Sequence, residues 1–122
     1  ISAMSYGALS AYAVEALSIG AKEAGILINT GEGGLPENHL RGGSDLIFQL
    51  GTAKFGLRHP DGSLDDEAFE KLCEQPKIKM IEIKLSQGAK SGKGGIMPKE
   101  KISKEISELR GVGRDHDVVS PP

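Results

Sequence analysis

The chain has 122 residues, a formal net charge of −2, 38% apolar residues and a single cysteine. This length allows one modest domain, and the nearly balanced charge gives no strong attraction to nucleic acid or to an anionic membrane. One cysteine excludes an internal disulfide, so we expect a reducing compartment, the cytoplasm. No apolar stretch approaches the roughly 18–20 residues that a membrane span needs.

The first half of the chain predicts a helix, a strand and a loop in succession. The helix follows the N-cap Ser10 and stops at Gly25, because small and apolar residues recur between them at helical spacing. Residues 25–29 are short and β-branched, which predicts a buried strand, and residues 30–38 predict a loop. Residues 46–56 are apolar enough for either a strand or a short helix.

Two further helices are predicted in the second half. The acidic residues 65–67 suit a helix N-terminus, because carboxylates stabilise the positive end of the helix dipole. Cys73 lies on the apolar face of this helix and is predicted to be buried, and Pro76 ends the helix. Pro98 suits the first position of the last helix, which Gly111 ends.

Strands predicted at residues 79–85 and 117–120 complete an alternating order of strands and helices. Such an order predicts parallel βαβ units and therefore an α/β fold. The chain opens with Ile1 as if within a strand, so we expect residues 1–122 to be an excised piece of a larger domain.

Unusual loops follow the predicted strands at residues 3–7, 29–34 and 86–95. Ligands gather at the carboxyl ends of parallel strands, so these loops predict a ligand site. Their glycines either let the backbone approach an anionic ligand or only form turns, and both interpretations stay open.

Lys84 ends the strand at 79–85 and shares one face of it with Met80 and Glu82. In a closed barrel this face points inward, and Glu82 is then the expected ion-pair partner of Lys84. Such a lysine could polarise an oxygen, donate a proton or complement a reduced anionic cofactor. The alternative is a lysine that extends into solvent from a polar face.

The remaining polar residues carry weaker signals. Glu32 is either a base or an ordinary loop carboxylate. His39, His59 and His116 lie in polar segments without metal-ligand spacing, which predicts three surface histidines and no metal site.

Five ordered segments, spread from the first residue to the last, share one specific pattern. They are ISAMSYGALS (1–10), NTGEGG (29–34), QLGTAKFG (49–56), IEIKLSQGAKSGKGGIMPKEK (81–101) and VVSPP (118–122). Together they resemble the FMN-binding synthase domain of glutamate synthase, above all the short, stand-alone glutamate-synthase-like proteins of bacteria and archaea. The resemblance covers the whole chain and about half of the family's domain. It implies about half of a (β/α)₈ TIM barrel with parallel strands.

The resemblance also implies an activity. The parent protein would be an FMN-dependent oxidoreductase of nitrogen metabolism and glutamate biosynthesis, with an electron donor that the sequence does not identify. It would reduce 2-iminoglutarate, formed from 2-oxoglutarate and ammonia, to L-glutamate. A complete barrel needs about 250 residues, so we expect the isolated chain to be inactive and to bind FMN weakly or not at all.

The resemblance implies site residues as well. The backbone of three residues would lie along the flavin ring: Ala3, Met4 and Ser5. Two residues would lie near flavin or substrate: Asn29 and Thr30. Four residues are candidates for the chemistry: Glu32, Lys84, Gln87 and Lys90. Lys84 is expected nearest the reacting atoms and in contact with the cofactor.

Two other functions stay open. The chain could be a non-catalytic α/β module that self-associates as a homo-oligomer, because a half-barrel leaves edge strands unpaired. It could also belong to an FMN barrel that acts on another 2-oxo or 2-hydroxy acid.

Overall fold

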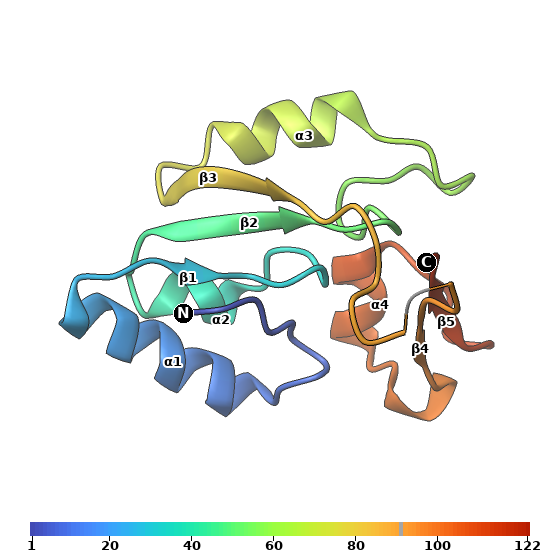
Figure 1. Cartoon of the computed structure of the whole chain (residues 1–122), viewed down its shortest axis with the longest axis horizontal. Helices are drawn as coiled ribbons and strands as arrows, with labels where there is room; N and C mark the ends of the chain where they lie inside the picture. Colours follow the sequence, from blue (N-terminus) through green and yellow to red (C-terminus); the bar gives the residue numbers. More distant parts are fainter. Residues whose placement is uncertain (91) are drawn as a thin grey trace.

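A computed structural model describes residues 1–90 and 92–122 as an α/β fold (Figure 1). The main sheet contains three parallel strands in the order β1 (Ile28–Asn29), β2 (Leu46–Leu50) and β3 (Ile78–Ile83). The predicted α/β class and the parallel pairing of these strands are confirmed. The ambiguous segment 46–56 begins as a strand and continues as turns.

The first residue of the chain lies beside this sheet. The Ile1 amino group donates to the Leu27 carbonyl at 2.6 Å, and the Asn29 N–H donates to the Ile1 carbonyl at 3.0 Å. A residue that bonds to both neighbours of the opposite residue has the hydrogen-bond pattern of a parallel pair. The chain at Ile1 therefore lies alongside β1 and runs in the same direction.

Helix α1 (Ala11–Ala24) has the ends that the sequence predicts. Ser10 caps it by accepting a hydrogen bond from the Ala13 N–H, and Gly25 ends it in the left-handed conformation with φ 65°. Ala21 is completely buried and shares a hydrophobic cluster with Ile28 and Leu46. The small residue brings the helix close to β1 and β2.

A short helix, α2 (Glu37–Arg41), begins inside the segment predicted as loop, so the prediction for 30–38 is wrong over its last two residues. It packs against α1, and the Ser18 hydroxyl donates to the His39 carbonyl at 2.6 Å. Gly42 follows the helix and lies directly against the backbone of α1 at Ser18 and Ile19. A Cβ at Gly42 would lie 2.5 Å from the Ile19 nitrogen and closer still to Ser18.

Gly42→Ala is expected to lower the free energy of unfolding by about 1–3 kcal/mol, because the backbone of α1 leaves no room for a methyl group. Gly20→Ala is the matched control, since Gly20 lies within α1 and a Cβ there meets no atom within 4 Å. This control should raise the free energy of unfolding by about 0.5–1 kcal/mol. Urea denaturation of both variants tests the pair, and equal effects would contradict the close contact.

His39 corrects the prediction of three surface histidines. Its side chain is 1% exposed, and its Nδ1 has no hydrogen-bond partner within the described residues. Burial disfavours the charged ring and lowers the pKa of His39 to about 4. The polar sequence of α2 gave no sign that its inner face packs on α1. His59 and His116 are exposed, as predicted.

Acidification is expected to destabilise the fold through His39. The folded pKa lies below the ordinary value of 6.5, so the unfolded chain binds a proton first as the pH falls. The contribution of His39 to the free energy of unfolding is fully present above pH 6.5. It is lost between pH 6.5 and about pH 4, by an amount on the order of 3 kcal/mol. Denaturant unfolding at pH 7 and pH 5 measures the loss. His39→Gln should show a smaller pH dependence, and an equal one would contradict this assignment.

Helix α3 (Asp66–Cys73) has the predicted acidic start. Asp65 caps it by accepting from the Ala68 N–H at 2.9 Å, and the helix ends before Pro76. Cys73 is exposed, so its predicted burial is wrong. The physical reason is that no residue of α3 is buried, and the helix flanks β3, an edge strand whose residues 79–83 are themselves exposed.

The last third of the chain departs from the predicted parallel units. Strand β4 (Gly95–Met97) pairs with β5 (Val118–Ser120) in a separate antiparallel sheet. The strand predicted at 117–120 exists, but it does not join the parallel sheet. A short strand directly after the glycine-rich loop was not predicted from the sequence.

The single helix predicted from Pro98 to Gly111 is two helices. A 3₁₀ helix, η1 (Lys99–Lys101), precedes α4 (Lys104–Arg110). The break arises because Ser103 acts as a second N-cap and accepts from the Ile106 N–H at 3.1 Å. Gly111 ends α4 in the left-handed conformation, as predicted.

Helix α4 and the small sheet stand at the carboxyl ends of the parallel strands (Figure 1). A hydrophobic cluster holds them there: Tyr6, Val14, Ala53, Phe55, Ile102, Ile106 and Val118. The loops that follow the parallel strands therefore face α4 and the small sheet. No helix among the described residues has the length and apolar character to cross a membrane.

Candidate functional site

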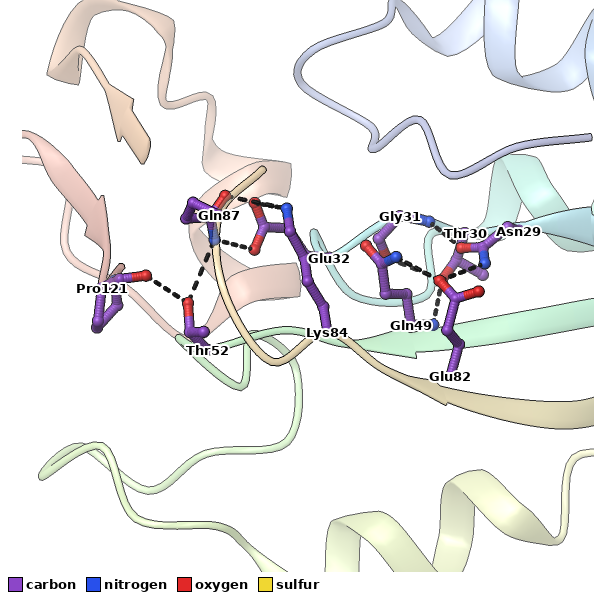
Figure 2. A network of polar contacts seen from close by, with 10 residues as sticks. All are labelled: Asn29, Thr30, Gly31, Glu32, Gln49, Thr52, Glu82, Lys84, Gln87 and Pro121. Atoms are coloured by element: carbon purple, nitrogen blue, oxygen red, sulfur yellow. Dashed lines mark hydrogen bonds and ion pairs between the residues drawn. The ribbon is translucent and has the colours of Figure 1, made fainter. Parts of the chain in front are cut away.

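Lys84 lies just beyond β3, and its side chain extends toward the loop after β1 (Figure 2). Its Nζ lies 3.2 Å from Glu32 Oε1 and donates to Gln87 Oε1 at 2.9 Å. The Lys84 and Glu32 side chains are 26% and 17% exposed. Because this ion pair is partly buried, solvent screens it less than it screens a surface ion pair. The ion pair therefore holds the lysine side chain in a defined place.

Gln87 closes the contact between these two charges. Its Nε2 donates to Glu32 Oε2 at 2.8 Å and to Thr52 Oγ1 at 3.2 Å, and the Thr52 hydroxyl donates to the Pro121 carbonyl at 2.6 Å. We call these five residues the Lys84 cluster: Glu32, Thr52, Lys84, Gln87 and Pro121. They come from the chain that follows β1, β2, β3 and β5, so four strand ends meet at one place.

Glu82 is not the partner of Lys84, which corrects the predicted ion pair. Its Oε1 accepts from Asn29 Nδ2 at 3.0 Å and from Gln49 Nε2 at 2.5 Å. Two side-chain amides, one from β1 and one from β2, thus donate to Glu82. Lys84 lies past the end of β3, where the carboxylate within its reach belongs to Glu32 instead.

Asn29 and Thr30 are buried and hold the loop after β1 in shape. Asn29 Oδ1 accepts from the Gly31 N–H at 2.9 Å. The Thr30 hydroxyl accepts from the Gln49 N–H at 3.1 Å and donates to the Gly31 carbonyl at 2.9 Å. Both predicted residues therefore lie beside the Lys84 cluster, and their side chains make hydrogen bonds to other groups of the chain (Figure 2).

The segment Ala3–Ser5 lies directly against the loop after β1. A Cβ at Gly31 would lie 2.5 Å from the Ser5 nitrogen and 2.8 Å from the Met4 carbonyl carbon, and Gly31 has φ 69°. Glycine is required here by both conformation and space. At this position the glycine serves the packing of two loops, and Ala3 is left exposed.

Lys90 lies apart from the Lys84 cluster. Its side chain is exposed, and its carbonyl accepts from the N–H groups of Lys93 and Gly94 at 3.0 Å each. It lines an open hollow together with Gly88 and Ile96. The structure brings together three of the four candidate residues for the chemistry and leaves Lys90 on the surface. Residue 91, within the predicted loop 86–95, lies outside the described residues.

Arg110 is a site residue that the sequence predictions missed. It is 5% exposed, its Nη2 donates to the Tyr6 carbonyl at 2.9 Å, and its guanidinium lies 5.0 Å from the centre of the Phe55 ring. Its Nε has no hydrogen-bond partner within residues 1–90 and 92–122. Burial lowers the pKa of Arg110, and the negative charge of Glu32 opposes that shift.

Tyr6 fastens the first loop to α4 at two points. Its carbonyl accepts from Arg110, and its hydroxyl donates to Glu105 Oε2 at 2.5 Å. The bond to Glu105 raises the pKa of Tyr6 to about 12, because the carboxylate favours the protonated phenol. Both ends of α4 are thus tied to the segment that contains Ser5.

A cavity of about 210 Å³ lies among these elements. Its lining includes Ser5, Gly7, Glu32, Gly95, Lys101 and Arg110. The volume is below the roughly 300–1,000 Å³ of pockets for drug-sized ligands. Two cationic side chains and one carboxylate suit a small organic acid that also carries a hydrogen-bonding group.

Comparison with known proteins gives a consistent result over the whole chain. The family model described as a conserved region in glutamate synthase matches residues 1–122. The glutamate synthase large subunit-like protein of Bacillus subtilis is 46% identical over 121 residues, which cover 98% of this chain and 23% of that protein. The archaeal glutamate synthase [NADPH] of Archaeoglobus fulgidus is 40% identical over 120 residues, or 98% of this chain and 21% of that protein.

A third relative is more distant. The archaeal-type glutamate synthase [NADPH] of Thermotoga maritima is 35% identical over 119 residues, which cover 98% of this chain and 21% of that protein. The chain therefore spans about a fifth to a quarter of the length of these relatives.

Proposed function

Because the chain belongs to the glutamate synthase family, we propose that residues 1–122 form the N-terminal half of an FMN-binding (β/α)₈ barrel. The parallel order of β1, β2 and β3 supports a partial barrel, and so does the gathering of loops at their carboxyl ends. The apolar edge strand β3 is exposed, as expected where a barrel would continue.

We propose that the intact protein reduces 2-iminoglutarate, formed from 2-oxoglutarate and ammonia, to L-glutamate. When bound, FMN would supply the hydride. In this proposal the flavin lies against the segment Ala3–Ser5, of which Ser5 lines the cavity, and near the charged Lys84 cluster on the neighbouring loops. In phosphate-binding barrels the phosphate loops follow strands seven and eight, outside these 122 residues.

In this proposal each residue of the site has a role in catalysis or in substrate binding. Lys84 donates a hydrogen bond or a proton to the reacting imine or carbonyl, and Glu32 with Gln87 keeps it oriented. Arg110 and Lys101 line the cavity and bind the carboxylates of the dicarboxylic acid. The exposed Lys90 assists binding of the anionic substrate from outside.

The observation that carries the proposal is the meeting of Glu32, Lys84 and Gln87 beside the cavity that Arg110 lines. The test uses the intact protein, with glutamate formation from 2-oxoglutarate and ammonia measured in the presence of FMN. NADPH is the first electron donor to examine, because it appears in the names of the relatives. A cytoplasmic location is part of this proposal, and the single, exposed Cys73 is compatible with it. Flavin-dependent turnover only with another 2-oxo or 2-hydroxy acid would redirect the proposal to that substrate.

Residues 1–122 alone are expected to bind FMN far more weakly than the intact protein, because the phosphate loops lie elsewhere. The chain should be purified without a flavin absorbance band and should show no saturation in a fluorescence titration. The intact protein, purified in the same way, serves as the positive control. A yellow preparation of the isolated chain would overturn this expectation.

A second candidate is a non-catalytic module that associates with itself. It is favoured by three exposed apolar side chains on the edge strand β3 and just beyond it: Met80, Ile83 and Leu85 are 55%, 66% and 87% exposed. Sedimentation velocity of the isolated chain tests this function. A dimer that Ile83→Lys converts to a monomer would support self-association, whereas a monomer at every concentration would exclude it.

A further inference from the structure

We propose that Thr52 is a positioning residue that fixes the orientation of the Gln87 amide and, through it, the positions of Lys84 and Glu32. Thr52 follows β2, and its hydrogen bonds run to Gln87 and Pro121 rather than to either charged side chain. Its hydroxyl links Gln87 to the C-terminal residues of the chain (Figure 2).

The direction of each hydrogen bond follows from what the partners can do. A proline carbonyl only accepts, so the Thr52 hydroxyl must use its single proton on Pro121, at 2.6 Å. The oxygen of Thr52 is then available only as an acceptor. It therefore requires a donor from Gln87, and the amide nitrogen lies 3.2 Å away.

The charged partners require the same orientation. The Lys84 ammonium has only donors and faces the Gln87 oxygen, while the Glu32 carboxylate has only acceptors and faces the nitrogen. A reversed amide would place its nitrogen against the ammonium and its oxygen against the carboxylate. Thr52 adds a third constraint, which is anchored to the backbone through the Pro121 carbonyl.

This anchor connects the site to the small sheet. Pro121 directly follows β5, and β5 pairs with β4, which follows the loop that carries Gln87. The hydrogen bond from Thr52 to Pro121 thus connects the end of β2 to the end of β5. Loss of the hydroxyl should loosen Gln87 while the ion pair remains possible.

The kinetic test rests on the proposed function. In the intact protein, Thr52→Val keeps the shape and removes the hydroxyl, and glutamate turnover should fall by about threefold to tenfold, the effect of one hydrogen bond. The KM for 2-oxoglutarate should change by less than about twofold, because Thr52 does not line the cavity. Thr52→Ser keeps the hydroxyl and should restore turnover, which separates positioning from packing.

A second readout does not depend on activity. Competition labelling of lysines with acetic anhydride, analysed by mass spectrometry, reports how firmly Lys84 Nζ is held. In Thr52→Val the labelling rate of Lys84 should rise by about threefold to tenfold, relative to the exposed Lys79 of β3 as an internal standard. Thr52→Ser should label as the unaltered protein does. If Thr52→Val fails to fold, Thr52→Ala takes its place in both experiments.

The outcomes separate the two proposals. Unchanged labelling of Lys84 in Thr52→Val overturns the positioning role, whatever the activity. Equal losses of turnover in the valine and serine variants overturn it too, because packing alone would then explain them. Faster labelling in a protein that forms no glutamate supports the role of Thr52 and shows that the proposed function has failed.

Discussion

Lys84→Met in the intact protein is expected to lower the turnover of glutamate formation by about 100-fold or more, the usual effect of removing one donor that stabilises charge in the transition state. Lys84 is the cation at the centre of the site, with Glu32 and Gln87 as partners. Methionine keeps the unbranched side chain up to the ε position and removes both the charge and the N–H donors. The loss should appear in kcat, because the lysine acts on the reacting group.

The fold should tolerate this substitution. Glu32 keeps its hydrogen bond from Gln87 at 2.8 Å and is partly exposed to water, so its charge is not left without a donor. We expect a loss of about 1–2 kcal/mol in the free energy of unfolding, the cost of one charge-assisted hydrogen bond. Thermal unfolding and the flavin absorbance spectrum show whether the variant is folded and loaded.

Lys79→Met is the matched control. Lys79 lies on the same strand, β3, but at its amino end and exposed to solvent, so turnover should stay within about twofold of the unaltered protein, as for a surface position. A folded, flavin-loaded Lys84→Met variant with unchanged kcat would remove this lysine from the mechanism. An equal loss in Lys79→Met would show that the effect is one of stability.

Local sequence signals predicted the elements whose ends are determined by nearby residues. Helix α1 is the best case, because Ser10 and Gly25 act within one turn of the helix they bound. Helix α4 shows the limit of such signals. Pro98 is a valid helix start by itself, but Ser103 caps a separate helix and divides the segment. Two competing starts in one segment cannot be ranked without the tertiary contacts.

Burial was harder to predict than secondary structure. Cys73 lies on the apolar face of α3, but no residue of this helix is buried against the rest of the fold. The thiol is therefore exposed. His39 is the opposite case, a histidine in a polar helix that α1 covers. Which face of a helix meets the core depends on partners far along the chain, and local composition does not contain that information.

The ion pair of Lys84 illustrates the same limit within the site. Alternation along the predicted strand 79–85 placed Glu82 and Lys84 on one face, and the nearest carboxylate on that face was the expected partner. The structure pairs Lys84 with Glu32, which is 52 residues away in sequence. The end of a strand is free to turn toward another loop, and the pairing then depends on how the strands are arranged in the sheet.

Arg110 was missed even though the sequence contains a signal for it. Ile106 is buried within α4, and Arg110 follows it by one turn on the same face of that helix. A cation on a buried helix face requires partners, and this alone makes it a candidate for a site. Helical spacing from Ile106 is enough to recognise such a cation.

Arg110→Met is expected to raise the KM for 2-oxoglutarate by about 100-fold, because truncating one partner of a buried charge pair costs about 2–5 kcal/mol. The guanidinium lines the cavity, and its Nε has no hydrogen-bond partner among the described residues. A substrate carboxylate would bind the guanidinium where it lines the cavity. Since the carboxylate is bound in both the ground state and the transition state, kcat should change much less than KM.

Arg110→Lys separates charge from geometry. A lysine at this position keeps the positive charge but not the planar fork that binds a carboxylate at two points. We expect an intermediate rise in KM, about tenfold, if the fork matters as well as the charge. Isothermal titration with 2-oxoglutarate measures binding directly, without any need for turnover.

The stability of the Arg110 variants has to be measured in parallel. Arg110→Met removes the donor to the Tyr6 carbonyl and the cation over Phe55, which together should cost about 1–3 kcal/mol of unfolding free energy. Arg114→Met is the matched control, because Arg114 is exposed just beyond the same helix and donates to the backbone carbonyl of Ile102. A folded Arg110→Met protein with normal affinity for 2-oxoglutarate would show that the buried guanidinium serves only to fasten α4 to the first loop.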